Sequence, residues 1–482
     1  MLFSQDCRWI HRILRERGSF MEKYQRITLD KNKEDYLYQQ LADEIVILID
    51  EKIIKGEERL PSIKNLSQCL AVNIATVVRA YEVLEEKDYI VKKPGSGCFV
   101  KSREEKILNF ASGTPSYDFF PIEDFKKIIN HVMDKDGAKA FEYTQGQGDM
   151  ELRRELREYI RKYNIHSHED QIHVISGAQQ GIDLIVKALL TQKDTVIIEN
   201  PSYTGAIGAF KSRGVQLEGV PLKNDGMDLK KLEETIKKTD PKLLYVMPNF
   251  QNPTGTSYSS YQKNKLLSLA KEYDFYILED DYLSDLSFYS QDSRTLKSLD
   301  KENKVIYLKS FSKIFMPGLR LGFLVVPEEL QSSIREAKLI SDISTSGLLQ
   351  RALKEYMGQG LWAKHIEALK NLYQKRFDLA MGEIREQMPK TVKYTFPKGG
   401  LNFWFELPEG VEEQEFINQL ETMNILVAPG HLFFHEETDK SYFRMSIANV
   451  EEKEIRQGLE KIARLIQWET ATKKSGKEPL IL

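Results

Sequence analysis

Apolar residues fall at helical spacing over much of the first hundred residues. Between residues 36 and 56 they lie at Leu41, Ile45, Leu48, Ile49 and Ile53. This pattern predicts an amphipathic helix that ends at Gly56. A second helix is predicted to begin at Pro61 and Ser62, and a third follows with Asn73 as its N-terminal cap.

Two short β-prone runs come next, in YIVKKPGSGCFV at residues 89–100, and they flank Pro-Gly-Ser-Gly. Proline and glycine between two such runs predict a β-hairpin. Three helices followed by a hairpin describe a winged helix-turn-helix, which we assign to residues 21–100.

Beyond residue 110, β-branched or aromatic runs alternate with helical segments. The runs are QIHVISG, DTVIIENP, KLLYVMPN, FYILEDD and KVIYLKSFS. The alternation predicts an α/β domain over residues 110–482, with a mostly parallel sheet that helices cover on both faces. Such sheets bind ligands beyond the carboxyl ends of their strands. Residues 101–109 form a polar predicted linker, and nine extended residues span at most about 30 Å, which keeps the N-terminal module near the larger domain.

The composition is that of a soluble globular protein with several domains. Of the 482 residues, 41% are hydrophobic and 29% are charged. No apolar run approaches the roughly 18 residues of a membrane span, and three cysteines are too few for a disulfide framework, so we expect a cytoplasmic protein. The net charge is -3, and residues 36–103 carry ten basic and ten acidic side chains, so a polyanion would be bound by directed charges rather than bulk attraction.

Residues 1–20 are treated as an extension of doubtful status. They contain four arginines between apolar residues, which is one feature of a targeting presequence. However, Asp6 and Glu16 interrupt the pattern and no cleavage pattern follows. The second interpretation, which we favour, is an upstream start codon with Met21 as the working start.

The strongest chemical cluster is SFSKIFMPGLRLGF at residues 310–323, directly after a predicted strand. It places Lys313 between Ser310 and Ser312 on one side and Arg320 on the other. A buried lysine forms a Schiff base readily because desolvation lowers its pKa and frees the amine. Two hydroxyls and a guanidinium nearby would bind a phosphate. A lone lysine here would be an ordinary loop residue, but the cluster favours a cofactor site.

Two further strand ends carry groups that suit pyridoxal phosphate (PLP). In EDDYLSDL, Asp280 can keep the ring nitrogen protonated and Tyr282 can bond the ring hydroxyl, although an acidic surface loop is the alternative. In PNFQNPTG, Pro253 restrains Asn252 and can be cis, which would fix the amide at the cofactor oxygen. Alone, Asn-Pro indicates only a turn.

Two weaker motifs complete the set. SGAQQG joins a strand to a helix, where the backbone N–H groups of Ala178 and Gln179 can hold a phosphate. ENPSY places Tyr203 after another strand, where its ring could stack on the cofactor or simply pack in the core.

The order of these motifs resembles that of fold-type I, class I/II aminotransferases over residues 110–482. The resemblance implies Lys313 as the Schiff-base lysine, Asp280 at the ring nitrogen, and Asn252 with Tyr282 at the ring oxygen. It implies Tyr203 as the stacking residue. It places around the phosphate Ala178, Gln179, Ser310, Ser312 and Arg320.

Two more roles follow from the same resemblance. Tyr143, in YTQGQG, matches a tyrosine that reaches the phosphate of the partner subunit. Arg444, in YFRMSIAN, matches an arginine that pairs with a substrate α-carboxylate, whereas its ordinary alternative is a surface charge. A homodimer is implied, because the active sites of this family lie at the subunit interface. No metal site is predicted.

The N-terminal module resembles the GntR winged-helix family in LPSIKNL, TVVRAYEVLE and GSGCFV, and its fusion to an aminotransferase-like domain resembles the MocR subfamily of regulators. The residues expected to contact DNA are Lys64, Thr76, Arg79, Lys92, Lys93, Gly95, Ser96 and Gly97. The family usually has arginine where Lys64 and Ile74 stand. Lysine lacks the planar guanidinium that makes two hydrogen bonds to guanine, and the isoleucine side chain donates no hydrogen bond at all. We therefore infer no operator sequence from relatives. Arg79 could instead pair with Glu82 on the same helix.

The expected function is therefore a PLP-dependent transcription regulator that binds double-stranded DNA. Its effector would be an amine or amino acid that displaces Lys313, or PLP itself. The alternative is an active aminotransferase with an auxiliary DNA-binding module, because the cofactor residues are all present.

Overall fold

The chain consists of two units, Met1–Lys106 and Ile107–Leu482. In this computed structural model the described residues are 21, 23–30, 36–101, 106–289 and 293–475. The predicted extension at 1–20 and residues 102–105 of the predicted linker lie outside them. Within the described part of the chain, no helix combines the length and the apolar character needed to cross a bilayer.

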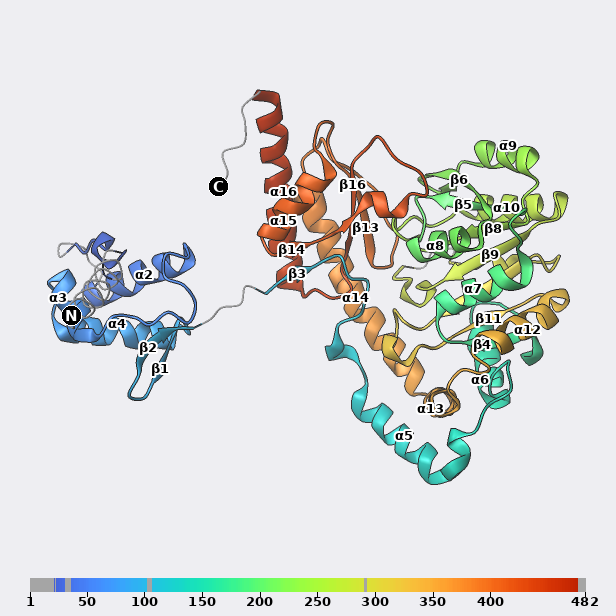
Figure 1. Cartoon of the computed structure of the whole chain (residues 1–482), viewed down its shortest axis with the longest axis horizontal. Helices are drawn as coiled ribbons and strands as arrows, with labels where there is room; N and C mark the ends of the chain where they lie inside the picture. Colours follow the sequence, from blue (N-terminus) through green and yellow to red (C-terminus); the bar gives the residue numbers. More distant parts are fainter. Residues whose placement is uncertain (1–20, 22, 31–35, 102–105, 290–292, 476–482) are drawn as a thin grey trace, which may run out of the picture. The chain divides into compact units, whose positions relative to one another are not determined.

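The first unit is a winged helix-turn-helix (Figure 1). Its elements are α2 (Leu37–Asp50), α3 (Ile63–Leu70), α4 (Ile74–Glu86), β1 (Ile90–Lys93) and β2 (Gly97–Val100), and the two strands form the predicted antiparallel hairpin. The Ser62 hydroxyl accepts the Asn65 N–H and the Asn73 amide oxygen accepts the Ala75 N–H, so both predicted helix starts are confirmed.

The end of α2 differs from the prediction. The helix stops at Asp50 rather than at Gly56, because Lys52 adopts a left-handed backbone with φ of 59°. Hydrophobic spacing continues past this point, since Ile54 is buried in the core of the unit, but the backbone there is no longer helical.

The second unit is built on an eight-stranded sheet in the order β4-β11-β10-β9-β8-β5-β6-β7. Its strands are β4 (Ile172–Ile175), β5 (Thr195–Asn200), β6 (Gln216–Lys223), β7 (Gly226–Met227), β8 (Leu243–Val246), β9 (Tyr276–Asp281), β10 (Val305–Ser310) and β11 (Gly322–Val325). The central strands from β10 to β6 are parallel, and β11, β4 and β7 run antiparallel to their neighbours. The predicted α/β class and mostly parallel sheet are confirmed.

Both faces of this sheet are buried, as the continuous apolar runs predict. In β5, Val196 and Ile198 pack in one core with α7 (Ala178–Leu189) and α8 (Thr204–Arg213). Ile197 packs on the other face with α9 (Leu229–Thr239) and α10 (Ser260–Glu272), as the green and yellow ribbons of Figure 1 illustrate. Helices α6 (Met150–Arg161), α11 (Leu296–Leu299) and α12 (Gln331–Ser341) also belong to this part of the unit.

A smaller sheet follows in the order β12-β13-β16-β15. Its strands are β12 (Lys393–Tyr394), β13 (Asn402–Glu406), β15 (Ala428–Pro429) and β16 (Tyr442–Ser446). The remaining elements are α5 (Ile122–Asp136), α13 (Gly347–Gly358), α14 (Leu361–Gln387), α15 (Glu413–Thr422), α16 (Glu452–Ser475) and the short parallel pair β3 (Leu108–Asn109) and β14 (Ile425–Leu426). The pairing of β13 with β16 sets Asn402 beside Ser446 and Trp404 beside Arg444.

Candidate functional site

A cavity of about 210 Å³ lies where the parallel strands of the large sheet end. Every predicted cofactor or effector residue except Tyr143 lines it: Ala178, Gln179, Tyr203, Asn252, Asp280, Tyr282, Ser310, Ser312, Lys313, Arg320 and Arg444. Segments separated by more than 200 residues thus converge on one space, as expected for the carboxyl edge of such a sheet.

Lys313 lies in the turn that follows β10 and is half-buried. Burial, together with the positive charges of Arg444 and Arg320, lowers the pKa of its amine to about 8. The backbone of Gly113 lies beside it, and a Cβ there would stand 3.5 Å from the Lys313 Nζ. The lysine is therefore more nucleophilic at neutral pH than an exposed one.

Asp280, near the end of β9, is only 2% exposed. Its Oδ2 accepts a hydrogen bond from the Tyr245 hydroxyl at 2.7 Å, whereas its Oδ1 has no hydrogen-bond partner among the described residues. Burial raises the pKa of Asp280 to about 7. A cationic or N–H group in the cavity would satisfy this oxygen and favour the ionised carboxylate.

Another part of the cavity wall consists of Arg444, Asn252 and Tyr282. Arg444 extends from β16, donates to the Asn252 Oδ1 at 3.1 Å and to the Ala111 carbonyl, and its Nε has no partner in the described structure. Asn252 precedes a cis proline, as the sequence suggested. The Tyr282 hydroxyl donates to the Phe250 carbonyl at 2.6 Å. Arg444 therefore brings a buried guanidinium, not fully hydrogen-bonded, to the cavity wall, and such a group favours an anion.

The other end of the cavity suits an anion. Arg320 donates to the Ser312 hydroxyl at 3.3 Å and to the Ser176 carbonyl at 3.2 Å, beside the N-terminus of α7. Gly177, with φ of 89°, permits this approach, because a Cβ there would lie 2.4 Å from an Arg320 nitrogen. Guanidinium, hydroxyls and helix N–H groups together form a typical phosphate site.

Tyr203 and Gln179 close one side, where the Gln179 amide donates to the Gly205 carbonyl at 2.9 Å. Tyr143 lies outside the cavity, and its side chain is 83% exposed. Its predicted role concerns a partner subunit and stays a prediction.

Sequence reasoning missed five lining residues: Gly113, Met247, Leu401, Asn402 and Ser446. Asn402 matters most, since its amide donates to the Tyr282 hydroxyl at 3.1 Å. It lies within an apolar strand, where the sequence carries no signal for it. Gly113 had a weak signal, because FASGTP resembles a strand end followed by a turn.

In the winged helix, the predicted DNA contacts fall on α3, α4 and the hairpin, and all are exposed except the half-buried Thr76. Arg79 pairs with Glu82 at 2.8 Å, as the alternative interpretation predicted, and Lys92 pairs with Glu85 at 2.6 Å. Lys93 has no acidic partner in the described structure and lies over the Phe99 ring.

The structure adds Arg59 to the DNA-binding candidates. Arg59 is exposed, and its backbone forms an isolated antiparallel β-bridge with Phe99 in the hairpin. A Cβ on Gly97 would stand 3.1 Å from the Arg59 Nε. This proximity depends on the fold of the unit, so the sequence alone gave no reason to place Arg59 at the hairpin.

Comparisons with known proteins match both units. A family described as "Aminotransferase class I and II" matches residues 105–462, and "Bacterial regulatory proteins, gntR family" matches residues 37–100. The HTH-type transcriptional regulator YcxD of Bacillus subtilis is 31% identical over 435 residues, which cover 88% of this chain and 98% of that protein. Aromatic-amino-acid aminotransferase 1 of Thermococcus litoralis is 32% identical over 369 residues, or 75% and 88% of the two chains.

Among solved structures, Pyrococcus horikoshii kynurenine aminotransferase in complex with PMP aligns with a TM-score of 0.73 and 32% identity, over 76% of this chain and 92% of that one. The chain therefore belongs to the class I and II aminotransferase family and, with a GntR domain ahead of that fold, has the architecture of the MocR-like transcription regulators.

Proposed function

We propose that this chain is a PLP-dependent transcription regulator that binds DNA as a homodimer and responds to an amino acid at Lys313. One observation carries the proposal: a chain with a GntR domain also has Lys313, Asp280, Arg320 and Arg444 in a single cavity. In this role the protein acts in the cytoplasm, where bacterial DNA lies.

The residues present fit PLP. Asp280 offers a buried oxygen without a partner to the ring nitrogen, while Arg320, the two serines and the start of α7 offer donors to the phosphate. Lys313 lines the same cavity and has a lowered pKa. When bound, PLP supplies an aldehyde that amines attack and a ring that withdraws electrons.

The residues of the cavity would bind and orient both the cofactor and the effector. Arg320 and the N-terminus of α7 would bind the phosphate, and Asp280 would hold a proton on the ring nitrogen. Lys313 would supply the amine that competes with the effector amine for the cofactor aldehyde. Arg444 would hold the effector carboxylate through the N–H that has no partner in the described structure.

A homodimer is supported by the exposure of apolar residues in two adjoining segments. Phe141 and Tyr143 are 68% and 83% exposed, and Ile343 is 50% exposed. The two segments lie together, since a Cβ on Gly347 would stand 2.9 Å from the Glu142 carbonyl. Such a surface suits a second copy of the chain, and two-fold symmetry suits paired DNA half-sites.

The effector acts through the DNA-binding unit only if its affinity differs between DNA-competent and DNA-incompetent arrangements. Because Leu108 and Asn109 form strand β3 of the second unit, the proposed linker is shorter than the predicted 101–109 and ends by residue 107. Seven residues span at most about 25 Å, so this tether limits how far the winged helix can move from the large unit.

The first experiment records the visible absorbance of the full chain with PLP beside Lys313→Ala. We expect an absorbance band in the wild type and none in the variant. The standard amino acids are then added one at a time, while fluorescence anisotropy follows binding to DNA from upstream of the gene.

An amino acid that changes both the band and the DNA affinity, and loses both effects in Lys313→Ala, supports the regulator. No band in the wild type would refute the cofactor site. A normal band with steady transamination and no DNA binding would instead favour the aminotransferase.

A further inference from the structure

A buried ionic cluster lies behind the strand ends that carry the cavity residues. Lys309 in β10 is paired across the sheet with Asp281 in β9. Its Nζ lies 2.8 Å from the Asp285 Oδ2 and 3.3 Å from the Asp281 Oδ2, and none of the three side chains is more than 1% exposed. Because alternate residues of a strand point to opposite faces, these side chains point away from Asp280 and Ser310, which face the cavity.

Tyrosines and a second lysine complete this group, which we call the Lys309 cluster. Its members are Lys162, Asp281, Asp285, Lys309, Tyr159, Tyr163 and Tyr307. The Tyr307 hydroxyl donates to Asp281 at 2.6 Å, and the Tyr159 hydroxyl donates to Asp285 at 2.8 Å. Two lysines face two carboxylates, so the charges balance.

The cluster is held in its ionic form. Burial alone would lower the pKa of Lys309, yet Asp281 and Asp285 outweigh it and raise that pKa above its usual value. Burial also opposes ionisation of Asp285, but Lys309 and Lys162 hold its pKa well below the usual range. A buried ionic group of this kind adds little net stability compared with apolar packing, but it fixes geometry, and losing one member leaves an uncompensated charge.

The cluster joins helix α6 to strands β9 and β10, and both strands lead into residues that line the cavity. β9 leads into Asp280 and Tyr282, and β10 leads into Ser310 and Lys313. Tyr159 lies on α6, while Lys162 and Tyr163 follow it directly.

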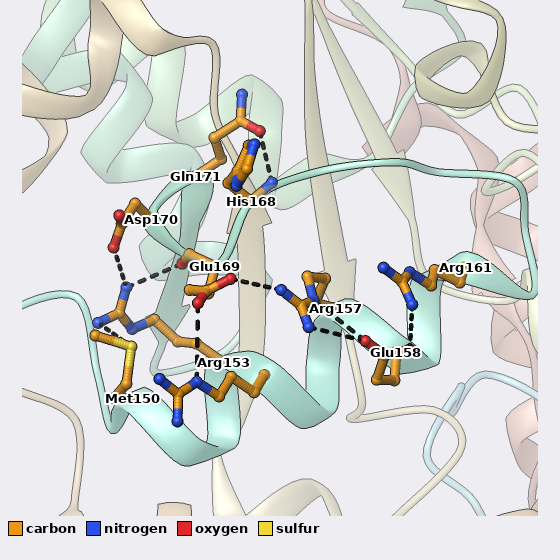
Figure 2. A network of polar contacts seen from close by, with 10 residues as sticks. Met150, Arg153, Arg157, Glu158, Arg161, His168, Glu169, Asp170 and Gln171 are labelled. Carbon is orange, nitrogen blue, oxygen red and sulfur yellow. Dashed lines mark hydrogen bonds and ion pairs between the residues drawn. The ribbon is translucent and has the colours of Figure 1, made fainter.

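Helix α6 is also fixed on a second side, to the segment before β4 (Figure 2). Arg157 pairs with Glu169 at 2.7 Å, and Arg153 donates to the Glu169 carbonyl at 2.9 Å. β4 in turn leads to Ser176 and Gly177 at the phosphate end of the cavity. A continuous set of contacts therefore connects β9, β10, α6 and β4 on the side of the sheet away from the cavity. Of these elements, β9 carries Asp280, β10 leads to Lys313 and β4 leads to the phosphate end of the cavity.

We propose that Lys309 is a positioning residue for the cofactor. By tying β9 to β10 and both strands to α6, it sets the separation of Asp280 from Lys313. This inference rests on the cofactor function proposed above and deepens it.

The test compares Lys309→Met with Lys297→Met in the full chain. Lys297 also forms a buried pair, with Asp300 at 3.1 Å, and donates to the carbonyl of Val305 at the other end of β10. Removing either lysine therefore leaves a buried carboxylate without its lysine partner. Only Lys309 lies behind the cavity.

We expect Lys309→Met to weaken PLP affinity by about 10-fold to 100-fold, the range found for residues that orient the ligands of a bound metal, which act in the same indirect way. The wavelength and the pH midpoint of the visible band should change as well. The double variant Lys309→Met/Asp281→Asn balances the charge but still lacks the tie between β9 and β10, so its PLP affinity should stay low; full recovery would show that an uncompensated charge, and not lost positioning, caused the defect. Lys297→Met should lower the melting temperature of the apoprotein but leave PLP affinity and the band unchanged.

Tyr307→Phe keeps the volume and every charge and removes only one hydrogen bond to Asp281, so it tests the same idea if Lys309→Met does not fold. It should change the band and lower the melting temperature of the apoprotein less than Lys309→Met does, because only one hydrogen bond is lost. Wild-type affinity and band in both Lys309→Met and Tyr307→Phe, or an equal loss in Lys297→Met, would overturn the positioning role. A wild-type protein without a band would instead overturn the cofactor function itself.

Discussion

At the scale of single residues, the cavity combines a lysine with a lowered pKa and a carboxylate with a raised one. Both shifts have burial as their largest cause, and they act in opposite directions because burial disfavours the charged form of each group. For Lys313, the charges of Arg444 and Arg320 add to the effect. The two side chains thus hold less charge at neutral pH than they would in water.

A pH prediction follows for Lys313. Its amine attacks an aldehyde only when deprotonated, so the rate at which apoprotein combines with PLP should rise with pH and level off above a midpoint near 8. Arg444→Met removes a positive charge, which should raise the pKa of Lys313 and move the midpoint upward. Stopped-flow absorbance across the pH range measures both. Arg444→Lys retains the charge, and its midpoint should stay close to that of the wild type.

At the scale of elements, local hydrogen bonds determine where the helices of the first unit begin. Where α2 ends could not be predicted from the same local pattern. Ser62 and Asn73 could be identified as caps because the cap bonds lie within three residues along the chain. The predicted end of α2 at Gly56 was wrong, because hydrophobic spacing contains no information about the left-handed backbone at Lys52. The β1–β2 hairpin followed directly from its turn residues.

This hairpin offers a matched pair of lysines. Lys92 is neutralised by Glu85, whereas Lys93 has no acidic partner in the described structure. Lys93→Ala should therefore weaken DNA binding and reduce the slope of log affinity against log salt by about 0.9, the loss of one phosphate contact. Lys92→Ala should have a smaller effect. Anisotropy titrations at several salt concentrations would decide, and equal slopes for the wild type and both variants would remove the hairpin from the interface.

At the scale of the whole molecule, the sequence predicted the α/β class, the winged helix and eleven of the residues that line the cavity. It could do so because cofactor groups gather at strand ends, where short motifs with Gly, Pro, Asn and Ser mark the chain. Asn402 and the Lys309 cluster could not be found this way. Asn402 reaches Tyr282 only through the fold of the C-terminal sheet, and Lys309 reads as an ordinary strand residue until Asp285 and α6 are placed beside it.

The length of the proposed linker is testable in the full chain. Inserting a flexible Gly/Ser stretch of about nine residues between residues 103 and 104 would roughly double its maximum reach. DNA affinity without effector and the visible band should persist, but the change in DNA affinity caused by an amino acid should shrink. A control variant with residues 102–106 shuffled at constant length, which leaves strand β3 intact, should respond like the wild type. An undiminished response in the lengthened chain would show that linker length does not carry the coupling.

The partnerless oxygen of Asp280 also bears on the lifetime of the protein. A buried polar atom without a hydrogen bond raises the free energy of the folded chain, and a ligand that satisfies it binds the folded state but not the unfolded one. Newly made chains would thus be degraded faster in cells short of the cofactor than in cells well supplied with it. The amount of regulator would follow vitamin status before any effector is sensed.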